Sequence, residues 1–489
     1  MRPVRLLSAF VVCALFCLPL CFGQWSGDPA ANLVIADRSD EQVQPKVVAT
    51  ADGGFYVSWF DNATGGYDVY LQRLDAAGVE QWPHNGVLVA DRGYGWTQEY
   101  GLAVDTADYA LLAFGDGSVE GEEVRVARVD PDGNLVWGPD GVQVATGIEN
   151  FSPRVAGTSD GNIVVAWTQD GTIAVQKLDP DGNLLWGTGV TLSPPPSDFY
   201  MLSDLRSADA GTVIVSFVYQ PVFMTNHLYA QKLAAADGAL LWGASHVAVF
   251  DAGSLQMGNF PPFVSDGEGG AVFAWYLNSN PPPYFLQCRV QHVLANGTEA
   301  FAHQGVDVST YPTRQRVNPS AAFLPATDEV VVFWSETDEP QGQFGLYGQK
   351  LDASGVRQWT DNGVELVPLG GNQISWVVTL PFGDGALVAW VDSMAFGNEP
   401  LRGTRVDTDG NFVWATPIVD LATSPTGRSR LTGELSTVGY AAYAWQDGDF
   451  STYDIPAQNL NGDGSLGRAD IFSDGFESGD TSAWSATVP

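Results

Sequence analysis

Aspartate residues recur at one place in a repeating pattern of this 489-residue chain, where they could act together as a set. Each one closely follows an aromatic residue at the end of a short apolar run. Carboxylates gathered on one rim could bind a cation or serve as the acid and base of a glycosidase. Aspartate also starts turns, so these positions are typical of ordinary loop ends as well. The six candidates are Asp61, Asp116, Asp170, Asp338, Asp392 and Asp447.

The stretch "NLNGDGSLGRAD", from Asn459 to Asp470, has the spacing of a calcium loop. Oxygen-bearing side chains stand at Asn459, Asn461, Asp463 and Asp470, and Gly464 fills the sixth place, where such loops have glycine. The same stretch aligns with "KLDPDGNLLW" and therefore also reads as a hairpin turn. Because the companion helices of an EF-hand are missing from the pattern, we expect no resident metal or other cofactor, with calcium here as the alternative.

Other catalytic, metal-binding and nucleic-acid signatures do not occur in the sequence. The histidines lack HxH or HxxxH spacing, and there is no GxSxG, no SxxK, no glycine-rich phosphate loop and no sialidase Asp-box. A net charge of -35 repels nucleic acid and anionic membranes. The five histidines are His84, His227, His246, His292 and His303.

These residues belong to a repeat that spans nearly the whole chain. Apolar runs such as "GNIVVAWTQ" return at intervals of 50 to 59 residues, each with an aromatic residue in the same place. Alternating apolar and polar residues rich in β-branched side chains predict half-buried strands, and no segment has a helical period. The eight aromatic positions are Trp59, Phe114, Trp167, Phe217, Trp275, Trp334, Trp390 and Trp445.

A second series runs in step with the first and marks a hairpin in each repeat. A glycine, such as Gly182, supplies the positive φ of a tight turn, and an aromatic residue, such as Trp186, follows it four positions later. The eighth turn has Arg468 where the aromatic residue is due. The segment "QWSGDPAANLVIAD", Gln24 to Asp37, has the aromatic residue without the turn, because no turn precedes Trp25. We infer that this segment completes the eighth repeat.

Eight such repeats predict an all-β fold, an eight-bladed β-propeller of four-stranded blades over residues 24–466. A closed ring of small sheets leaves few exposed strand edges. The last blade is expected to be closed by the N-terminal strand, which would join the two ends of the chain without a disulfide. In the third repeat the four expected strands are residues 153–158, 161–167, 172–179 and 183–192.

One face of this ring is expected to carry any binding site, because the loops between the second and third strands share it with the loops between blades. Aromatic rings on the loops between blades suit stacking against sugars or gripping a protein segment, although some would simply cover blade ends. These candidates are Tyr94, Trp96, Tyr100, Phe151, Tyr200, Phe260, Tyr311 and Trp376. Nearby arginines could bind a carboxylate or be solvated: Arg314, Arg316, Arg428 and Arg430.

The signature "ARVDPDGNLVWGPDGVQVAT" resembles two bacterial propeller repeats, the quinoprotein-type repeat and the exported repeat that reads RLNxDGxLDxxFGxxG. The resemblance covers most of residues 24–466 and implies a propeller. Quinone-dependent enzymes of that fold use a pair of adjacent cysteines beside the cofactor. Cys288 stands alone in this part of the chain, and the threonine before the turn glycine is missing, so the sequence departs from the quinone enzymes.

The two ends of the chain carry targeting patterns. Residues 1–23, "MRPVRLLSAFVVCALFCLPLCFG", read as a signal peptide, with a lipoprotein ending at Cys21 as the alternative. No later stretch reaches the roughly 18 apolar residues of a spanning helix. The tail, residues 467–489, contains "IFSDGFESGDTSAWS", which resembles a C-terminal element of many exported bacterial proteins and implies a sorting or anchoring tag. A shortened jelly-roll module is the rival interpretation of this tail.

These observations favour a secreted, non-catalytic propeller that binds or displays a carbohydrate or protein ligand. We expect a monomer outside the cell or at the cell surface, held there through its tail if the tag anchors it, and the tail resemblance implies a Gram-negative bacterium. The alternative function is a secreted carbohydrate hydrolase or lyase that uses the aspartates of the rim.

Overall fold

The structure, a computed structural model, describes residues 24–468 apart from residues 93, 119–120, 148, 279–284 and 450. The predicted signal peptide, residues 1–23, and residues 469–489 of the predicted tail lie outside the described residues. Secondary structure in the described part consists of β-strands and one short 3-10 helix, Asp209–Gly211. None of its helices is therefore long and apolar enough to cross a membrane.

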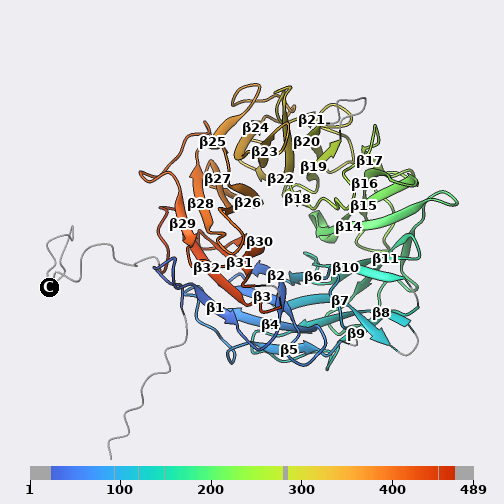
Figure 1. Ribbon diagram of the computed structural model, residues 1–489. Coiled ribbons are helices and arrows are strands. Elements are labelled where there is room, and N and C mark those ends of the chain that lie inside the picture. The colour runs from blue at the N-terminus through green and yellow to red at the C-terminus, as the bar shows by residue number, and fades with distance from the viewer. Residues whose placement is uncertain are drawn as a thin grey trace, which may run out of the picture.

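The strands form eight four-stranded antiparallel sheets arranged in a ring, which confirms the predicted eight-bladed propeller (Figure 1). Blade one contains β2 (Gln42–Ala49), β3 (Phe55–Asp61), β4 (Asp68–Leu74) and β5 (Val87–Ala90). Blade two contains β6 (Gly101–Val104), β7 (Ala110–Ser118), β8 (Gly121–Val129) and β9 (Val142–Ala145). Blade three contains β10 (Asn150–Gly157), β11 (Ile163–Gln169), β12 (Thr172–Leu178) and β13 (Val190–Leu192). Blade four contains β14 (Phe199–Ser207), β15 (Val213–Val222), β16 (Thr225–Leu233) and β17 (Val247–Phe250).

The second half of the ring repeats this order, with the first strand of each blade nearest the axis (Figure 1). Blade five contains β18 (Phe263–Ser265), β19 (Ala271–Asn278), β20 (Leu286–Val293) and β21 (Val306–Asp307). Blade six contains β22 (Arg314–Leu324), β23 (Glu329–Asp338), β24 (Phe344–Leu351) and β25 (Val364–Gly370). Blade seven contains β26 (Gln373–Phe382), β27 (Gly385–Ser393), β28 (Leu401–Val406) and β29 (Val419–Ala422). Blade eight contains β30 (Arg428–Leu435), β31 (Tyr440–Asp447), β32 (Ile455–Asn461) and β1 (Leu33–Ala36).

Blade eight joins the two ends of the described chain, as the sequence predicts. Strand β1 pairs antiparallel with β32, with Leu33 opposite Ala457 and Ala36 opposite Ile455. The outermost strand of this blade therefore comes from the N-terminal side of the chain, and Figure 1 shows it beside β32.

Trp25 takes the place of the missing eighth aromatic residue. In several other blades a third-strand glutamine donates to the carbonyl just after the aromatic residue, as Gln176 Nε2 does to Gly187 O over 3.1 Å. In blade eight, Gln458 Nε2 makes the same contact with Ser26 O over 2.6 Å. The hydrogen bond that holds the hairpin elsewhere thus connects the two chain ends here.

The aromatic residue of each hairpin packs on the turn glycine of the next blade. Gly133 has a φ of 88°, and a Cβ added there would meet the Trp82 ring at 3.1 Å. Gly78 has a φ of 79°, and a Cβ there would lie 2.6 Å from the Trp25 ring. Only glycine adopts this backbone conformation cheaply while leaving room for the indole. One contact of this kind therefore connects blade eight to blade one.

The core lies between neighbouring blades, where inward-facing side chains from two sheets meet. One such cluster combines Trp82 of blade one with Tyr100 and Phe114 of blade two. Most second-strand aromatic residues are fully buried, including Trp59, Trp275, Trp334, Trp390 and Trp445. Packing between blades accounts for these large side chains without any ligand.

The outer strands are shorter than the sequence suggests. In blade three the predicted strand over residues 183–192 is reduced to β13, Val190–Leu192. The reason is local, because Gln176 Oε1 accepts a hydrogen bond from the Trp186 backbone N–H over 3.2 Å and Gln176 Nε2 donates to Gly187 O. These two residues are held by a side chain and do not pair in the sheet.

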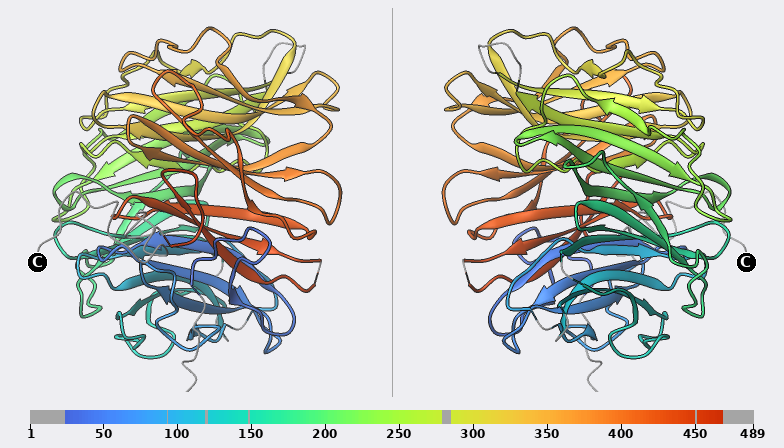
Figure 2. Two further views of the ribbon diagram at one scale, coloured as in Figure 1. Left: turned by 90° about the vertical axis from the view of Figure 1, so that its left-hand side faces the viewer. Right: turned by 90° about the vertical axis from the view of Figure 1, so that its right-hand side faces the viewer.

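The ring has two different faces, seen from the side in Figure 2. The loops between second and third strands and the loops between blades lie on one face, which we call the loop-bearing face. The turns between first and second strands and the hairpins before the outer strands lie on the other, which we call the hairpin face. This assignment follows from the antiparallel order of each sheet.

Candidate functional site

Four predicted acids stand two residues after a second-strand aromatic residue, where that strand ends: Asp61, Asp116, Asp392 and Asp447. In blade six the residue at this place is Glu336. Trp334 Nε1 donates to Glu336 Oε2 over 2.7 Å, and Trp445 Nε1 donates to Asp447 Oδ2 over 3.0 Å. In these two blades the carboxylate orients the indole that packs between blades.

Asp170 lies in the loop after β11, and Asp338 is the last residue of β23, four positions after Trp334. Asp170 is exposed and has a left-handed φ of 47°. Asp338 Oδ1 accepts hydrogen bonds from the backbone N–H groups of Gly342 and Gln343, over 2.7 and 3.0 Å. This is the usual geometry of an aspartate that starts a turn. The six predicted acids are therefore not equivalent positions of one ring.

An arginine faces each carboxylate at the end of a second strand. The shortest pairs are Asp392 with Arg402 at 2.7 Å and Asp447 with Arg428 at 3.2 Å. The remaining pairs are Asp61 with Arg38 at 3.8 Å, Asp116 with Arg125 at 3.5 Å, and Glu336 with Arg316 at 3.5 Å. Removing one partner from such a pair would leave an uncompensated buried charge. These acids are thus part of the framework of the loop-bearing face.

Burial acts on the protonation of these acids. Burial raises the pKa of Asp61, and the positive charge of Arg38 offsets this increase only in part. Burial likewise raises the pKa of Glu336 against the attraction of Arg316. Among the described residues, no group of three or more histidine, cysteine, aspartate and glutamate side chains could hold a metal ion.

The eight predicted aromatic residues differ widely in exposure. Trp96, Phe260 and Trp376 have exposed fractions of 48%, 42% and 39%. Tyr94, Tyr100 and Tyr200 are buried, whereas Phe151 and Tyr311 are half-buried. Tyr100 shows why, because its hydroxyl donates to Gln44 O over 3.0 Å and lies 2.8 Å from Ser58 Oγ. In the structure as described, only the first three offer an open ring.

Three further exposed aromatic side chains lie on the loop-bearing face: Phe199, Phe223 and Phe396. Phe223 lies at the tip between β15 and β16, and Phe396 lies in the loop between β27 and β28. Phe199 is the first residue of β14, after a loop between blades. The long loops that contain Phe223 and Phe396 can be recognised in the sequence, but the exposure of these rings cannot. All the exposed aromatic side chains of the described residues are therefore on one face.

Charged residues from several inner strands meet near the axis of the ring. Lys46 Nζ and Arg154 Nη2 lie 3.2 and 3.4 Å from Glu99 Oε2, and Arg430 Nη1 lies 4.0 Å from Glu99 Oε1. The Arg430 guanidinium lies over the Trp376 ring, 5.3 Å from its centroid. We call these five residues the axial cluster. They come from β2, β10, β26, β30 and the loop before β6, all near the axis in Figure 1.

Bulges in the inner strands shape this cluster. The pairing register shifts between Ser429 and Thr432 in β30, and between Ser375 and Val378 in β26. Arg430 and Trp376, inside these bulges, have left-handed φ values of 56° and 51°. A bulge redirects side chains relative to a regular strand. The local backbone therefore determines where these two side chains point.

The axial cluster is reachable by solvent although protein surrounds it. Side-chain exposure is 41% for Glu99, 44% for Arg430 and 28% for Lys46. Burial favours the neutral form of Glu99, but the charges of Lys46, Arg154 and Arg430 outweigh it and lower its pKa to about 2. Burial lowers the pKa of Lys46.

A second group of charges lies across the axis. Arg206 Nε of β14 is 2.9 Å from Asp204 Oδ2, and attraction to Asp204, and more weakly to Glu434, raises the pKa of Arg206. Burial raises the pKa of Glu434 in β30. Blades four and eight stand opposite each other in the ring, so these groups interact from opposite sides of the axis.

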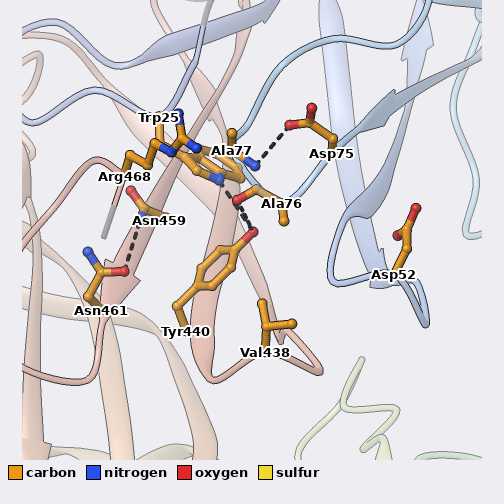
Figure 3. Close-up of a pocket in the computed structure, with 10 residues that line it drawn as sticks. All are labelled: Trp25, Asp52, Asp75, Ala76, Ala77, Val438, Tyr440, Asn459, Asn461 and Arg468. Atoms are coloured by element: carbon orange, nitrogen blue, oxygen red, sulfur yellow. Dashed lines mark hydrogen bonds between the residues drawn. The ribbon is translucent and has the colours of Figure 1, made fainter. Parts of the chain in front are cut away.

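A pocket on the hairpin face lies where blade eight meets blade one (Figure 3). Trp25 Nε1 donates to the Tyr440 hydroxyl over 3.4 Å, and that hydroxyl donates to Ala76 O over 2.9 Å. Asn459 and Asn461, two residues of the calcium-loop pattern, also line it. Trp25, Tyr440, Asn459 and Asn461 make hydrogen bonds that join blade eight to blade one or form the eighth hairpin, so these lining residues have a structural role.

The calcium-loop pattern forms the eighth hairpin. Asn459 Nδ2 donates to Gly467 O over 2.7 Å, and Asn461 Nδ2 donates to Ser465 Oγ over 3.0 Å. Asp463 Oδ1 accepts from the Ser465 backbone N–H over 3.0 Å. Asp470 lies outside the described residues. The side chains described here make the hydrogen bonds of a tight turn.

Comparison with known proteins shows no family for this chain. No protein-family model matches the chain, and no curated protein matches it. The structure titled Dos1 propeller is similar at 12% identity and a TM-score of 0.44, covering 88% of this chain and 95% of that one. A protein of unknown function from Dyadobacter fermentans is similar at 11% identity and a TM-score of 0.39, with 88% and 97% covered.

The polysaccharide lyase Uly1 is similar at 10% identity and a TM-score of 0.43, covering 89% of this chain and 92% of that one. At these identities and TM-scores the three likenesses carry no conclusion about the activity or ligand of this chain.

Proposed function

We propose that this protein is an exported, non-catalytic binding module that holds a carbohydrate or protein ligand on its loop-bearing face. The observation that carries the proposal is the distribution of exposed aromatic side chains. In the described part of the chain, every one of them lies on that face: Trp96, Phe199, Phe223, Phe260, Trp376 and Phe396. The exposed large hydrophobic residues of the hairpin face are aliphatic, such as Leu184 and Leu241.

Aromatic rings held on a rigid ring of sheets suit binding, because they offer contact area and lose little conformational entropy. The acids at the ends of the second strands favour binding over hydrolysis. A retaining or inverting glycosidase needs one carboxyl group that donates a proton and another that stays ionised near the substrate. Here each of these acids faces an arginine, as Asp392 faces Arg402 at 2.7 Å.

The experiment is a binding screen of the full chain against glycans and culture polysaccharides, with and without calcium, in which mass spectrometry checks every ligand for shortened products. We expect binding without new products. A Trp96→Ala variant and a Phe396→Ala variant should each weaken binding partially, because binding is spread over several rings. Shortened or unsaturated products that disappear in a D392N variant would instead establish a hydrolase or lyase.

A further inference from the structure

The axial cluster concentrates positive charge in a strongly acidic protein. Lys46, Arg154 and Arg430 share one carboxylate, that of Glu99, whereas the whole chain has a formal net charge of -35. Three cations and one anion leave the cluster positive. Arginine and lysine placed together in this way bind carboxylates through charge-assisted hydrogen bonds.

Arg430 is the cation that remains available. Among the described residues its side chain donates no hydrogen bond within 3.5 Å, and the nearest carboxylate oxygen, Glu99 Oε1, is 4.0 Å away. One face of its guanidinium rests on the Trp376 ring, which orients the group without occupying its N–H donors. By contrast, Arg428 and Arg316 are buried in ion pairs.

The backbone at Arg430 and Trp376 is left-handed. The same conformation occurs at Gln44, Ser152 and Asn318, inside the corresponding bulges of β2, β10 and β22, so it is a feature of the inner strands of this ring. What distinguishes Arg430 and Trp376 is that their two redirected side chains contact each other.

We propose that the axial cluster binds the carboxylate of an acidic saccharide, with the carboxylate on Arg430 and Lys46 and the apolar face of the sugar ring on Trp376. The inference rests on the proposed function and specifies its ligand class. A saccharide fits better than an acidic peptide, because an indole that is 39% exposed lies beside the Arg430 guanidinium. A pyranose uronate carries its carboxylate directly on a ring that can stack there.

The test measures binding of trigalacturonate to the full chain by isothermal titration calorimetry, with its neutral methyl ester as the matched probe. We expect the acid to bind, with an affinity that falls as salt is raised, and the ester to bind at least about tenfold more weakly. Arg430→Gln and Trp376→Ala should each weaken binding of the acid by about tenfold or more.

The control is Arg357→Gln, which removes the same charge from the hairpin face, where Arg357 lies 3.6 Å from Asp361. It should leave affinity unchanged, and melting curves of all variants show that they are folded. Equal binding of the ester, or equal weakening by Arg430→Gln and Arg357→Gln, would overturn the axial site.

Other outcomes distinguish the inference from the proposed function. Binding of a neutral glycan that is insensitive to Arg430→Gln keeps the binding module and removes the acidic-sugar site. Binding of hexaglutamate that depends on Arg430, without binding of trigalacturonate, would replace the saccharide with an acidic peptide. Binding of no saccharide at all would overturn the acidic-sugar site and leave only a protein ligand for the binding module.

Discussion

Glu99 is the residue on which the balance of the axial cluster depends. Its carboxylate is the shared partner of Lys46, Arg154 and Arg430. It stabilises the folded ring by pairing three cations that would otherwise repel one another. It also competes with any anion that approaches the same cations, so stability and ligand affinity are opposed at this position.

A Glu99→Gln variant should show this opposition directly. We expect the free energy of unfolding to fall by roughly 0.5–1 kcal/mol near neutral pH, because the pairs are partly solvated, and the affinity for trigalacturonate to rise. Denaturant titration and calorimetry measure the two quantities. A variant that loses both stability and affinity would show that Glu99 positions the cations for the ligand.

The pH dependence of the stability difference between wild type and Glu99→Gln follows from the pKa of Glu99. Burial raises this pKa, but the three cations outweigh burial and lower it to about 2. A lowered pKa adds stability that is complete above the unfolded value of 4.5 and is lost as the pH falls toward about 2. The stability difference between wild type and Glu99→Gln should therefore shrink across this interval.

The pKa of Asp454 is shifted in the opposite direction to that of Glu99. Burial, together with the charges of Asp37 and Asp447, raises its pKa to about 6 from 3.8. A raised pKa means that its contribution is favourable below the unfolded value and is lost as the pH rises through about 6. The structure is thus weakened by this carboxylate near neutral pH.

An Asp454→Asn variant should raise the free energy of unfolding at about pH 8 by on the order of 1 kcal/mol and have little effect at about pH 3.5. Chemical denaturation at both pH values checks this. Asp170→Asn, which changes an exposed loop aspartate, is the matched control and should be neutral at both. Stabilisation of equal size at both pH values would contradict the electrostatic explanation.

For single residues, the sequence predicted which residue types lie on the loop-bearing face better than it predicted their positions there. The sequence predicts acids after the second-strand aromatic residues, but in blade six the acid at this place is Glu336 and not the predicted Asp338. Exposure of the rim aromatic residues could not be deduced, since burial of Tyr100 depends on Gln44 and Ser58 from the neighbouring blade. That the exposed rings bind a ligand stays a prediction.

Among the elements, the hairpin before each outer strand joins one blade to the next. Its glycine accepts the aromatic ring of the preceding blade, as Gly78 accepts Trp25. The two requirements at this glycine are distinct, since one concerns its positive φ and the other concerns space for the ring.

A pair of substitutions separates these requirements. Gly65 has a φ of 93° and nothing within 4 Å of an added Cβ, whereas Gly78 has a φ of 79° and the Trp25 ring at 2.6 Å. Gly65→Ala should cost about 1–2 kcal/mol of stability through its backbone alone. Gly78→Ala should cost a further 1–3 kcal/mol through overpacking. Thermal unfolding compares them, and equal losses would show that the ring can move aside.

The hairpins were predictable from the sequence because glycine and the aromatic residue recur at fixed spacing. The inner-strand bulges were not, because Arg430 and Trp376 have no residue type that demands a left-handed conformation. The lengths of the outer strands were overestimated for a related reason. Gln176 diverts Trp186 and Gly187 from sheet pairing by side-chain hydrogen bonds, which alternation of residue types does not reveal.

For the whole molecule, stability depends on joining the two chain ends. The segment from Trp25 to Ala36 buries Trp25, Leu33 and Ile35, and its removal would also expose the edge of β32. Losing several such side chains costs a large part of the roughly 5–15 kcal/mol that stabilises a typical domain.

Deletion of residues 24–37 should therefore sharply lower the melting temperature or solubility, while deletion of residues 471–489 should leave the melting temperature nearly unchanged. Differential scanning calorimetry of both variants measures this. The melting temperature of a Trp25→Ala variant should lie between those of the two deletion variants. Similar melting temperatures for the two deletions would contradict the view that the N-terminal strand closes the ring.

The overall architecture was the most predictable property, because eight copies of one pattern give eight chances to read it correctly. The closure was recognised from two complementary defects, Arg468 in place of an aromatic residue and Trp25 without a turn, and it is confirmed by pairing of β1 with β32. Electrostatic interactions across the axis, such as that of Arg206 with Glu434, connect distant repeats and cannot be recognised in the sequence of either repeat.

The two ends of the described chain lie on the same face of the ring, the hairpin face. Gly27 and Gly467 are close, since a Cβ on Gly467 would lie 3.0 Å from the Gly27 backbone nitrogen, and both belong to the eighth hairpin. Any surface, carrier or label joined to the chain directly after Gly467 would therefore be attached at the hairpin face. The exposed aromatic rings and the axial cluster would then point outward, into the surrounding medium.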